Sequence, residues 1–228
     1  MALFLFDIDG TLLNTGGSGR KAANIVFKKY FNVDDVFNKI YLIGRSDKAI
    51  WEEAIKLTDI SYSYFQKIKP VILREYYKEL KRVILNNNKK EILPGIYNLL
   101  SHLKGKKHLL GLITGNLKKA AYIKLSPFNL EKFFPVGGFG DDSGDRNIIA
   151  KKAIKRARKF YNINFKNEEI FIIGDTPADI ISARSNKVRS IAVATGLHSF
   201  KDLKKYNPDF LFKDFANIDT FIKKINLK

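Results

Sequence analysis

The segment Phe4–Leu12, which reads FLFDIDGTL, constrains the fold of this chain more than any other. The run Ala2–Phe6 has no polar member, which is typical of a strand buried on both faces in a parallel sheet covered by helices. Ligands bind at the carboxyl ends of such strands, where Asp7 and Asp9 fall. Two carboxylates that lose hydration there repel each other, so a cation or a shared proton must compensate. A bound divalent metal is the simplest compensation.

Apolar runs of similar character recur along the chain, with helix-like stretches between them. The runs cover residues 2–6, 108–113, 170–173, 189–194 and 209–212. Strands that alternate with helices are typical of an α/β fold with a doubly wound, mainly parallel, Rossmann-like sheet. At 228 residues the chain is long enough for one such core with a smaller insertion.

The span 16–88 breaks this alternation, because it shows helical periodicity and little strand signal. The spacing of its apolar residues predicts three helices, over 19–30, 47–57 and 62–85. Stretches rich in Gly, Ser and Asn border the span on both sides and are typical of hinges. We therefore predict an α/β core made of residues 1–15 and 89–228, with 16–88 inserted as a separate helical unit.

A second strand-like run, Leu110–Ile113, ends in Thr114, Gly115 and Asn116 before a helix expected to begin near Leu117. The free N–H groups of a helix start favour an anion, and the Thr114 hydroxyl would add a donor. This turn indicates an anion site, although an ordinary strand-to-helix turn can have the same composition.

A third run, Ile170–Ile173, is followed by Gly174 and by Asp175 and Asp179, which are four residues apart. Pro177 suits the first turn of a helix, so both carboxylates can face one site. This strand end is the second strong sign of an acidic, metal-binding edge of the sheet.

These three strand ends resemble motifs I, II and IV of the haloacid dehalogenase superfamily. Phe4–Leu12 matches Asp-x-Asp-Gly-Thr, Leu110–Asn116 matches the Ser/Thr turn, and Ile170–Asp179 matches Gly-Asp-x-x-x-Asp. Short motifs give false positives, but three of them in the right order are specific. The resemblance covers nearly the whole chain and implies a haloacid dehalogenase-like sheet, with the helical insertion acting as a C1-type cap.

The third motif of this superfamily normally offers a lysine, often followed by proline, and here the sequence departs from the pattern. Arg146 precedes a helix expected to start near Ile148, and a bidentate guanidinium there would neutralise Asp7 and a phosphate. Lys151 is the second choice, because it would lie about a turn further from the site. An ordinary surface ion pair of Arg146 with an aspartate nearby in the sequence, Asp142 or Asp145, stays open.

The resemblance implies an Mg²⁺-dependent phosphatase that works through an aspartyl-phosphate. Asp7 would be the nucleophile and Asp9 the general acid and base. Mg²⁺ would be held by Asp7, by the Asp9 backbone carbonyl and by Asp175, with Asp179 in support. The phosphoryl group would be bound by Thr114, Gly115, Asn116 and Arg146. The second aspartate, Asp9, disfavours a dehalogenase, since that branch lacks it.

The turn Gly44–Asp47 resembles one in the caps of phosphoglycolate-phosphatase-like proteins, which makes Arg45 a candidate substrate ligand. The same turn is ordinary helix-start chemistry, because Ser46 or Asp47 can cap the helix that follows. We expect a small phosphorylated metabolite as substrate, with phosphoglycolate as the leading candidate. Two alternatives remain: a hexose-phosphate phosphomutase, and a non-catalytic nucleic-acid or protein-binding module on the same fold.

The amino-acid composition narrows the kinds of site and partner that remain to be considered. The chain has no cysteine, which excludes disulfides, zinc–thiolate sites and thiol nucleophiles. Its formal net charge of +18 invites a nucleic-acid partner, but the lysines and arginines are scattered along helices without a recognised module, which disfavours one. The longest apolar run is too short to span a membrane, and no secretory leader is evident. We expect a cytoplasmic monomer or homodimer without a membrane partner.

Overall fold

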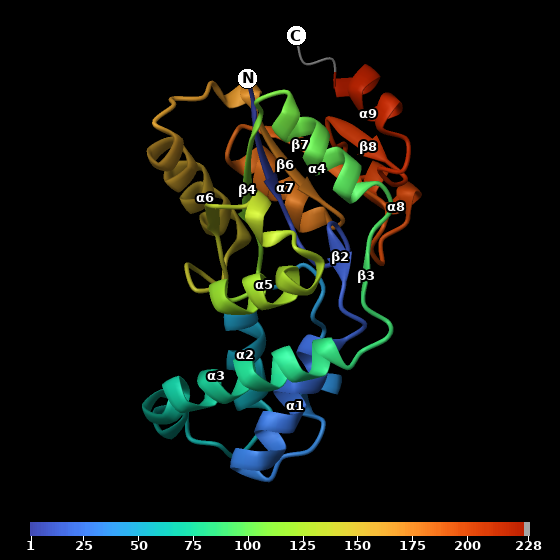
Figure 1. Ribbon diagram of the computed structural model, residues 1–228. Helices are drawn as coiled ribbons and strands as arrows, with labels where there is room; N and C mark the ends of the chain where they lie inside the picture. The colour runs from blue at the N-terminus through green and yellow to red at the C-terminus, as the bar shows by residue number, and fades with distance from the viewer. Residues whose placement is uncertain (226–228) are drawn as a thin grey trace.

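The computed structural model describes residues 1–225 and shows a doubly wound α/β core with a helical insertion (Figure 1). The core sheet has six strands, all parallel, in the order β5-β4-β1-β6-β7-β8. Their bounds are β5 Gly137–Gly138, β4 Leu109–Ile113, β1 Leu3–Phe6, β6 Ile170–Gly174, β7 Arg189–Val193 and β8 Phe210–Phe212. The predicted fold class is confirmed.

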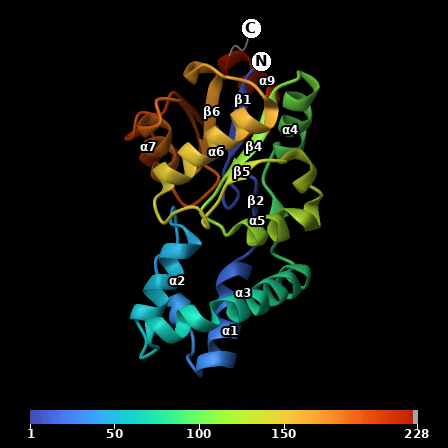
Figure 2. The ribbon, with the colours of Figure 1, turned by 90° about the vertical axis from the view of Figure 1, so that its left-hand side faces the viewer.

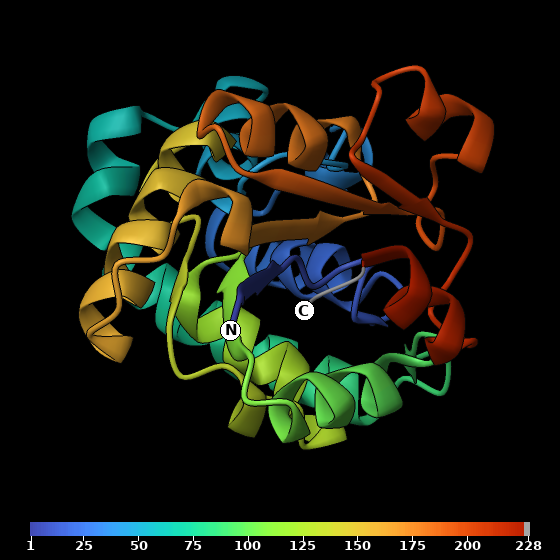
Figure 3. The same cartoon turned by 90° about the horizontal axis from the view of Figure 1, so that it is seen from above.

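Helices cover both faces of the sheet, as the view from above shows (Figure 3). The face on which Phe4 and Phe6 point is packed by α4 (Ile96–Gly105), α5 (Lys118–Leu125) and α9 (Ile218–Ile225). The opposite face, with Leu3 and Leu5, is packed by α6 (Arg146–Tyr161) and α7 (Pro177–Ser185). The short helix α8 (Phe200–Lys204) packs beside β8.

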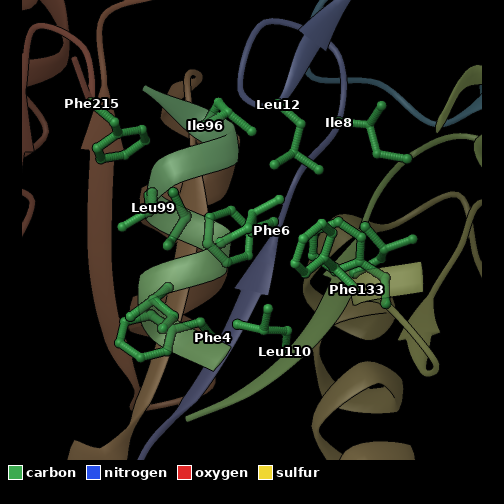
Figure 4. Packing of buried hydrophobic residues seen from close by; sticks show 14 of the residues in the cluster. Phe4, Phe6, Ile8, Leu12, Ile96, Leu99, Leu110, Phe133 and Phe215 are labelled. Carbon is green, nitrogen blue, oxygen red and sulfur yellow. The ribbon is translucent and has the colours of Figure 1, made fainter. Parts of the chain in front are cut away.

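The core explains why β1 carries no polar residue. All four residues of β1 are completely buried, because side chains that alternate along a strand enter the two different helical layers. Phe4 stacks on Phe171 of β6 with ring centroids 4.9 Å apart, and Figure 4 shows Phe4 and Phe6 beside Leu99 of α4. This two-sided packing holds the carboxyl end of β1, and hence Asp7, in a fixed place.

The insertion is formed by α1 (Ser18–Phe31), α2 (Asp47–Lys56) and α3 (Tyr62–Leu85), close to the predicted ranges. These helices lie beyond the carboxyl ends of the strands (Figures 1 and 2). They share a hydrophobic cluster of their own, centred on aromatic residues such as Phe27, Trp51 and Tyr76. Leu117 and Ala120, at the start of α5, belong to the same cluster, so the cap packs directly on the core.

The connections between cap and core are more ordered than the hinge composition suggests. β2 (Leu13–Asn14) and β3 (Glu91–Ile92) pair in an antiparallel ladder that ties the two crossings together. The Asn87 amide also donates hydrogen bonds to the backbone oxygens of Thr15 and Gly16, at 2.9 and 3.2 Å. The exact domain boundaries stay a prediction.

Within residues 1–225, no helix is both long and apolar enough to cross a bilayer.

Candidate active site

The carboxyl ends of β1, β4 and β6 open into one cavity of about 470 Å³ between the sheet and the cap. Eight of the residues singled out in the sequence line it, namely Asp7, Asp9, Arg45, Thr114, Gly115, Asn116, Arg146 and Asp175. Asp179 is buried behind them and contacts Arg146, whereas Lys151 is exposed on α6. The fold therefore brings together residues from distant parts of the chain.

Three buried carboxylates form an acidic cluster at this edge. Asp7, Asp175 and Asp179 each offer one oxygen, and these oxygens lie within 4.8 Å of one another. Burial raises the pKa of Asp7 to about 6, against the opposing charge of Arg146. Burial, followed by the charges of Asp7 and Asp179, raises the pKa of Asp175 well above its ordinary value. The folded protein thus disfavours the ionised forms of Asp7 and Asp175.

The backbone crowds the Asp175 carboxylate. Thr11 donates its hydroxyl to Asp175 Oδ1 at 3.0 Å. Gly10, whose φ is +78°, and Gly196 lie so close that an added Cβ would fall 2.4 and 1.7 Å from Asp175 Oδ2. The glycine of the Asp-x-Asp-Gly-Thr segment therefore both makes the turn and leaves room for the acid of another strand. We did not expect Thr11 or Gly196 to contact this acid.

Arg146 is the cation of the cluster. Its Nη2 atom lies 3.0 Å from Asp7 Oδ1 and 2.5 Å from Asp179 Oδ1, and its side chain is 10% exposed. Burial opposes the guanidinium charge, but the carboxylates of Asp179 and Asp7 outweigh it and raise the Arg146 pKa. The alternative ion pairs do not form, because Asp142 pairs with Arg156 and Asp145 caps the helix.

The start of α6 differs from the expectation. The helix begins at Arg146 and not near Ile148, because the Asp145 side chain accepts a hydrogen bond from Asn147 N at 2.8 Å and caps it there. Arg146 consequently occupies the first helical turn, from which its side chain reaches the sheet edge.

Asp179 is held in place from two sides. Its Oδ2 accepts hydrogen bonds from Thr176 N at 3.1 Å and Thr176 Oγ1 at 2.7 Å, closing a capping box at the start of α7. Its Oδ1 accepts from Arg146. Pro177 lies in the first turn of α7, as its position in the sequence indicated. The Asp179 carboxylate therefore orients the Arg146 guanidinium beside the other two acids of the cluster.

The turn after β4 is arranged to donate hydrogen bonds. Thr114 Oγ1 accepts bonds from Asn116 N at 3.2 Å and Asn116 Nδ2 at 2.8 Å, so its own proton remains available for a ligand. Gly115 N makes no hydrogen bond within residues 1–225. Both groups border the cavity.

The first N–H groups of α5 are occupied, contrary to the expectation that they would be free for an anion. Leu117 N donates to Asp47 Oδ2 at 2.8 Å, and Lys118 N donates to Asp141. Asp47 is the first residue of α2, so a carboxylate of the inserted helices caps the start of α5 in the core. Asp47 N also donates to Gly115 O at 2.7 Å.

Asp9 faces a different group of partners from Asp7. Lys124 Nζ lies 2.7 and 2.8 Å from the two Asp9 oxygens, and Asn116 Nδ2 donates to Asp9 Oδ2 at 2.7 Å. Sequence reasoning missed Lys124. Its signal was a charged residue at the spacing of the buried helix face that also contains Leu117, Ala120 and Ala121.

Arg45 lies at the cap side of the cavity. Its guanidinium pairs with Glu53 at 2.5 Å and donates to Tyr41 O at 3.1 Å, and about a third of the side chain is exposed. Ser46 Oγ accepts from Ala49 N, so the cap turn is also the helix start that its composition indicated. The two interpretations of this turn are compatible.

The acidic cluster fits a hard divalent cation. Its donors are carboxylate oxygens alone. Burial, with a smaller contribution from the neighbouring carboxylates, raises the pKa values of Asp7 and Asp175 despite Arg146, so a further cation would favour their charged forms. Asp9 lies outside this cluster through its side chain, which faces Lys124.

Comparison with known proteins identifies the family. The pattern of the family described as "Haloacid dehalogenase-like hydrolase" matches residues 4–193, which is most of the chain. The chain belongs to this family. A protein of Caldanaerobacter subterraneus named "Putative pyrophosphatase PpaX" is 27% identical over 221 residues, covering 96% of this chain and 93% of the relative.

Solved structures agree on the fold of this haloacid dehalogenase-like hydrolase. A beta-phosphoglucomutase from Clostridium difficile superposes with a TM-score of 0.74 at 21% identity, over 99% of this chain and 97% of the other. A predicted phosphoglycolate phosphatase from Haemophilus somnus gives 0.73 at 21% identity, over 97% of each chain. With the family match, the prediction of a haloacid dehalogenase-type phosphatase is confirmed at this level.

Proposed function

We propose that this phosphatase hydrolyses a small phosphomonoester, with Mg²⁺ as cofactor, through a phosphoryl group carried on Asp7. The observation that carries this proposal is the division between Asp7 and Asp9. The Asp7 carboxylate lies in the acidic cluster beside Arg146, whereas the Asp9 carboxylate faces Lys124 and Asn116. Two carboxylates in different surroundings can serve as nucleophile and as acid and base.

In the first step, an Asp7 oxygen attacks phosphorus and the bond from phosphorus to the ester oxygen breaks. Asp9, which must enter this step as the protonated acid, gives its proton to the departing oxygen and becomes a carboxylate. The Thr114 hydroxyl, Gly115 N–H and Arg146 guanidinium would hold the phosphoryl oxygens, where positioned donors supply most of the stabilisation in phosphoryl transfer.

In the second step, Asp9 takes a proton from a water molecule, which attacks phosphorus and frees Asp7 as phosphate leaves. The cap limits access of bulk water during the first step. It does so by packing on Leu117 and by the hydrogen bonds of Asp47 with Gly115 and Leu117.

Asp7 and Asp175 would hold Mg²⁺ with the Asp9 backbone carbonyl, and Asp179 would support them. When bound, the ion neutralises charge on the carboxylates and on the phosphoryl oxygens. Its removal should therefore abolish turnover without unfolding the chain.

Two kinds of substrate have support. Phosphoglycolate is supported by the resemblance of the Arg45 turn and by the name of the Haemophilus somnus structure. Inorganic pyrophosphate is supported by the name of the Caldanaerobacter relative. The cavity of about 470 Å³ suits either, and the cationic residues Arg20 and Arg45 are among those that line it. Phosphoglycolate remains the leading candidate.

A hexose-phosphate mutase shares these motifs and the cap, and one of the solved structures has that name. A mutase would return the phosphoryl group to a sugar instead of releasing it. A binding module without catalysis would bind nucleic acid or protein and release nothing.

The decisive experiment measures phosphate release from phosphoglycolate, hexose phosphates and pyrophosphate, with Mg²⁺ and with EDTA. Release that requires Mg²⁺ and disappears in Asp7→Asn supports the proposal. Conversion of a hexose phosphate into its isomer without net release would favour the mutase. A folded protein that converts none of these compounds would contradict the proposal.

A further inference from the structure

Lys124 makes three short hydrogen bonds, and all three are to residues of the site. Its Nζ atom lies 2.7 and 2.8 Å from the Asp9 oxygens and 2.6 Å from Asn116 Oδ1. An ammonium group has three N–H donors, so its capacity is filled. Within residues 1–225 the Lys124 ammonium has no other hydrogen-bond partner, and the side chain is only 8% exposed.

The position of Lys124 is costly for folding. It lies on the inner face of α5, beside Ala120, Ala121 and Leu125, where an apolar residue would pack without loss of hydration. Burying an ammonium group is unfavourable unless its partners compensate for the lost hydration. A lysine at this position is therefore better explained by what it does to Asp9 and Asn116 than by packing.

The hydrogen bonds form a closed ring. Lys124 donates to Asn116 Oδ1, Asn116 Nδ2 donates to Asp9 Oδ2, and Lys124 donates to Asp9 as well. Because the lysine takes the amide oxygen, the amide nitrogen must face Asp9 and Thr114. Thr114 Oγ1 then accepts from that nitrogen at 2.8 Å and keeps its own proton free for the cavity. One cation thus sets the orientation of two functional groups.

We propose that Lys124 is a positioning residue that holds the Asp9 carboxylate toward the leaving group and, through Asn116, points the Thr114 hydroxyl at the phosphoryl group. This inference rests on the proposed phosphatase function. Within residues 1–225 the Lys124 ammonium forms its hydrogen bonds with Asp9 and Asn116 and none with Asp7 or Asp175, so it acts through the residues that it orients.

The kinetic test uses Lys124→Met, which keeps the length of the side chain and removes its charge. Phosphoglycolate needs a proton from Asp9 when its alcohol leaves, whereas the nitrophenolate of p-nitrophenyl phosphate departs as a stable anion. We expect kcat/KM to fall by about 10² for phosphoglycolate, the lower end for loss of general acid catalysis. The fall for p-nitrophenyl phosphate should be at least tenfold smaller. Equal losses with both esters would overturn the proposal.

The matched control is Lys119→Met on the same helix, where the lysine is exposed and lies over the Tyr77 ring. Its kinetics should stay within about threefold of wild type for both esters, since an exposed cation–π contact is worth little. The melting temperature of Lys124→Met should not fall below that of this control.

A second readout does not depend on turnover. Both protons of the Asn116 side-chain amide are held, by Asp9 and Thr114, so they should exchange slowly with solvent. NMR, with Asn116→Ala to assign the signal, should show exchange at least tenfold faster in Lys124→Met. Unchanged exchange would overturn the proposal. If wild type hydrolyses neither ester, the phosphatase function fails while this measurement still decides whether Lys124 orients the amide.

Discussion

The guanidinium of Arg146 lies 3.0 Å from the Asp7 carboxylate and also contacts Asp179. It joins the first turn of α6 to the end of β1 and to the first turn of α7, and it is the only cation in contact with the acidic cluster within residues 1–225. A buried cation with two buried anions is difficult to replace, because removal of one member leaves the others uncompensated.

Arg146→Ala should lower kcat/KM by about 10²- to 10³-fold, the effect expected when one preorganised donor to a developing charge is lost. Lys151→Ala, at an exposed position of the same helix, should stay within about threefold of wild type. Steady-state kinetics with the best ester, beside circular dichroism to check folding, make the comparison. A larger loss in Lys151→Ala would assign the cationic role to that lysine.

Asp175→Asn should stabilise the metal-free protein at pH 7. Burial and the neighbouring carboxylates raise the pKa of Asp175, so its stabilising protonated form is fully present below its unfolded pKa and is lost as pH rises through the folded pKa. The amide removes that penalty and can still accept the Thr11 hydrogen bond. In EDTA the melting temperature should rise by more than about 2 °C, which corresponds to about 1 kcal/mol in a chain of this size.

Asp175→Asn should also lose the stabilisation that Mg²⁺ gives to the wild-type protein. Mg²⁺ should raise the melting temperature of wild type, because a ligand that binds only the folded state stabilises it. It should have little effect on Asp175→Asn. If Asp175→Asn melted at a lower temperature than wild type in EDTA, the buried charge of Asp175 would not destabilise the metal-free protein.

Asp47 should make the closed cap sensitive to pH. Burial raises its pKa to about 6, against the Lys124 charge and the Leu117 N–H bond. The stability that comes from the protonated form is fully present below the unfolded pKa of 3.8 and is lost as the pH rises through the folded pKa of about 6. Asp47→Asn should therefore match wild type near pH 4 and exceed it by about 2 kcal/mol above pH 6, allowing for partial exposure. Denaturant melts across pH 4 to 8 measure the difference, and a constant gap would count against it.

Gly115→Ala should push the cap away from the core. A Cβ at Gly115 would lie 2.3 Å from Arg45 O and 2.9 Å from Ser46 Cα, both of them backbone atoms. We expect faster hydrogen exchange over residues 41–50 and about a tenfold lower kcat/KM, because closure orders the site. Gly144→Ala is the control, since the nearest atom there, Ser46 Oγ, is 4.0 Å away. Equal exchange in the two variants would mean that Gly115 does not set the cap position.

The strand ends that carry Asp7, Thr114 and Asp175 could be predicted because each follows an uninterrupted apolar run that is buried on both faces. Helix α3 was equally clear, since its apolar residues recur every three or four positions. The edge strand β5 was not predicted. It is only Gly137 and Gly138, paired with Leu112 and Ile113, and two glycines give no periodic signal.

The buried strands at the centre of the sheet, the inserted helices and the acids at the strand ends could all be predicted, because these features depend on local periodicity and on residues close together in the chain. Three contacts became visible in the folded chain: Lys124 reaches Asp9, Asp47 caps α5, and Arg146 rather than Lys151 contacts Asp7. Such long-range polar contacts depend on the angle and register at which helices pack on the sheet. A lysine on a helix looks the same in sequence whether it faces water or a buried carboxylate.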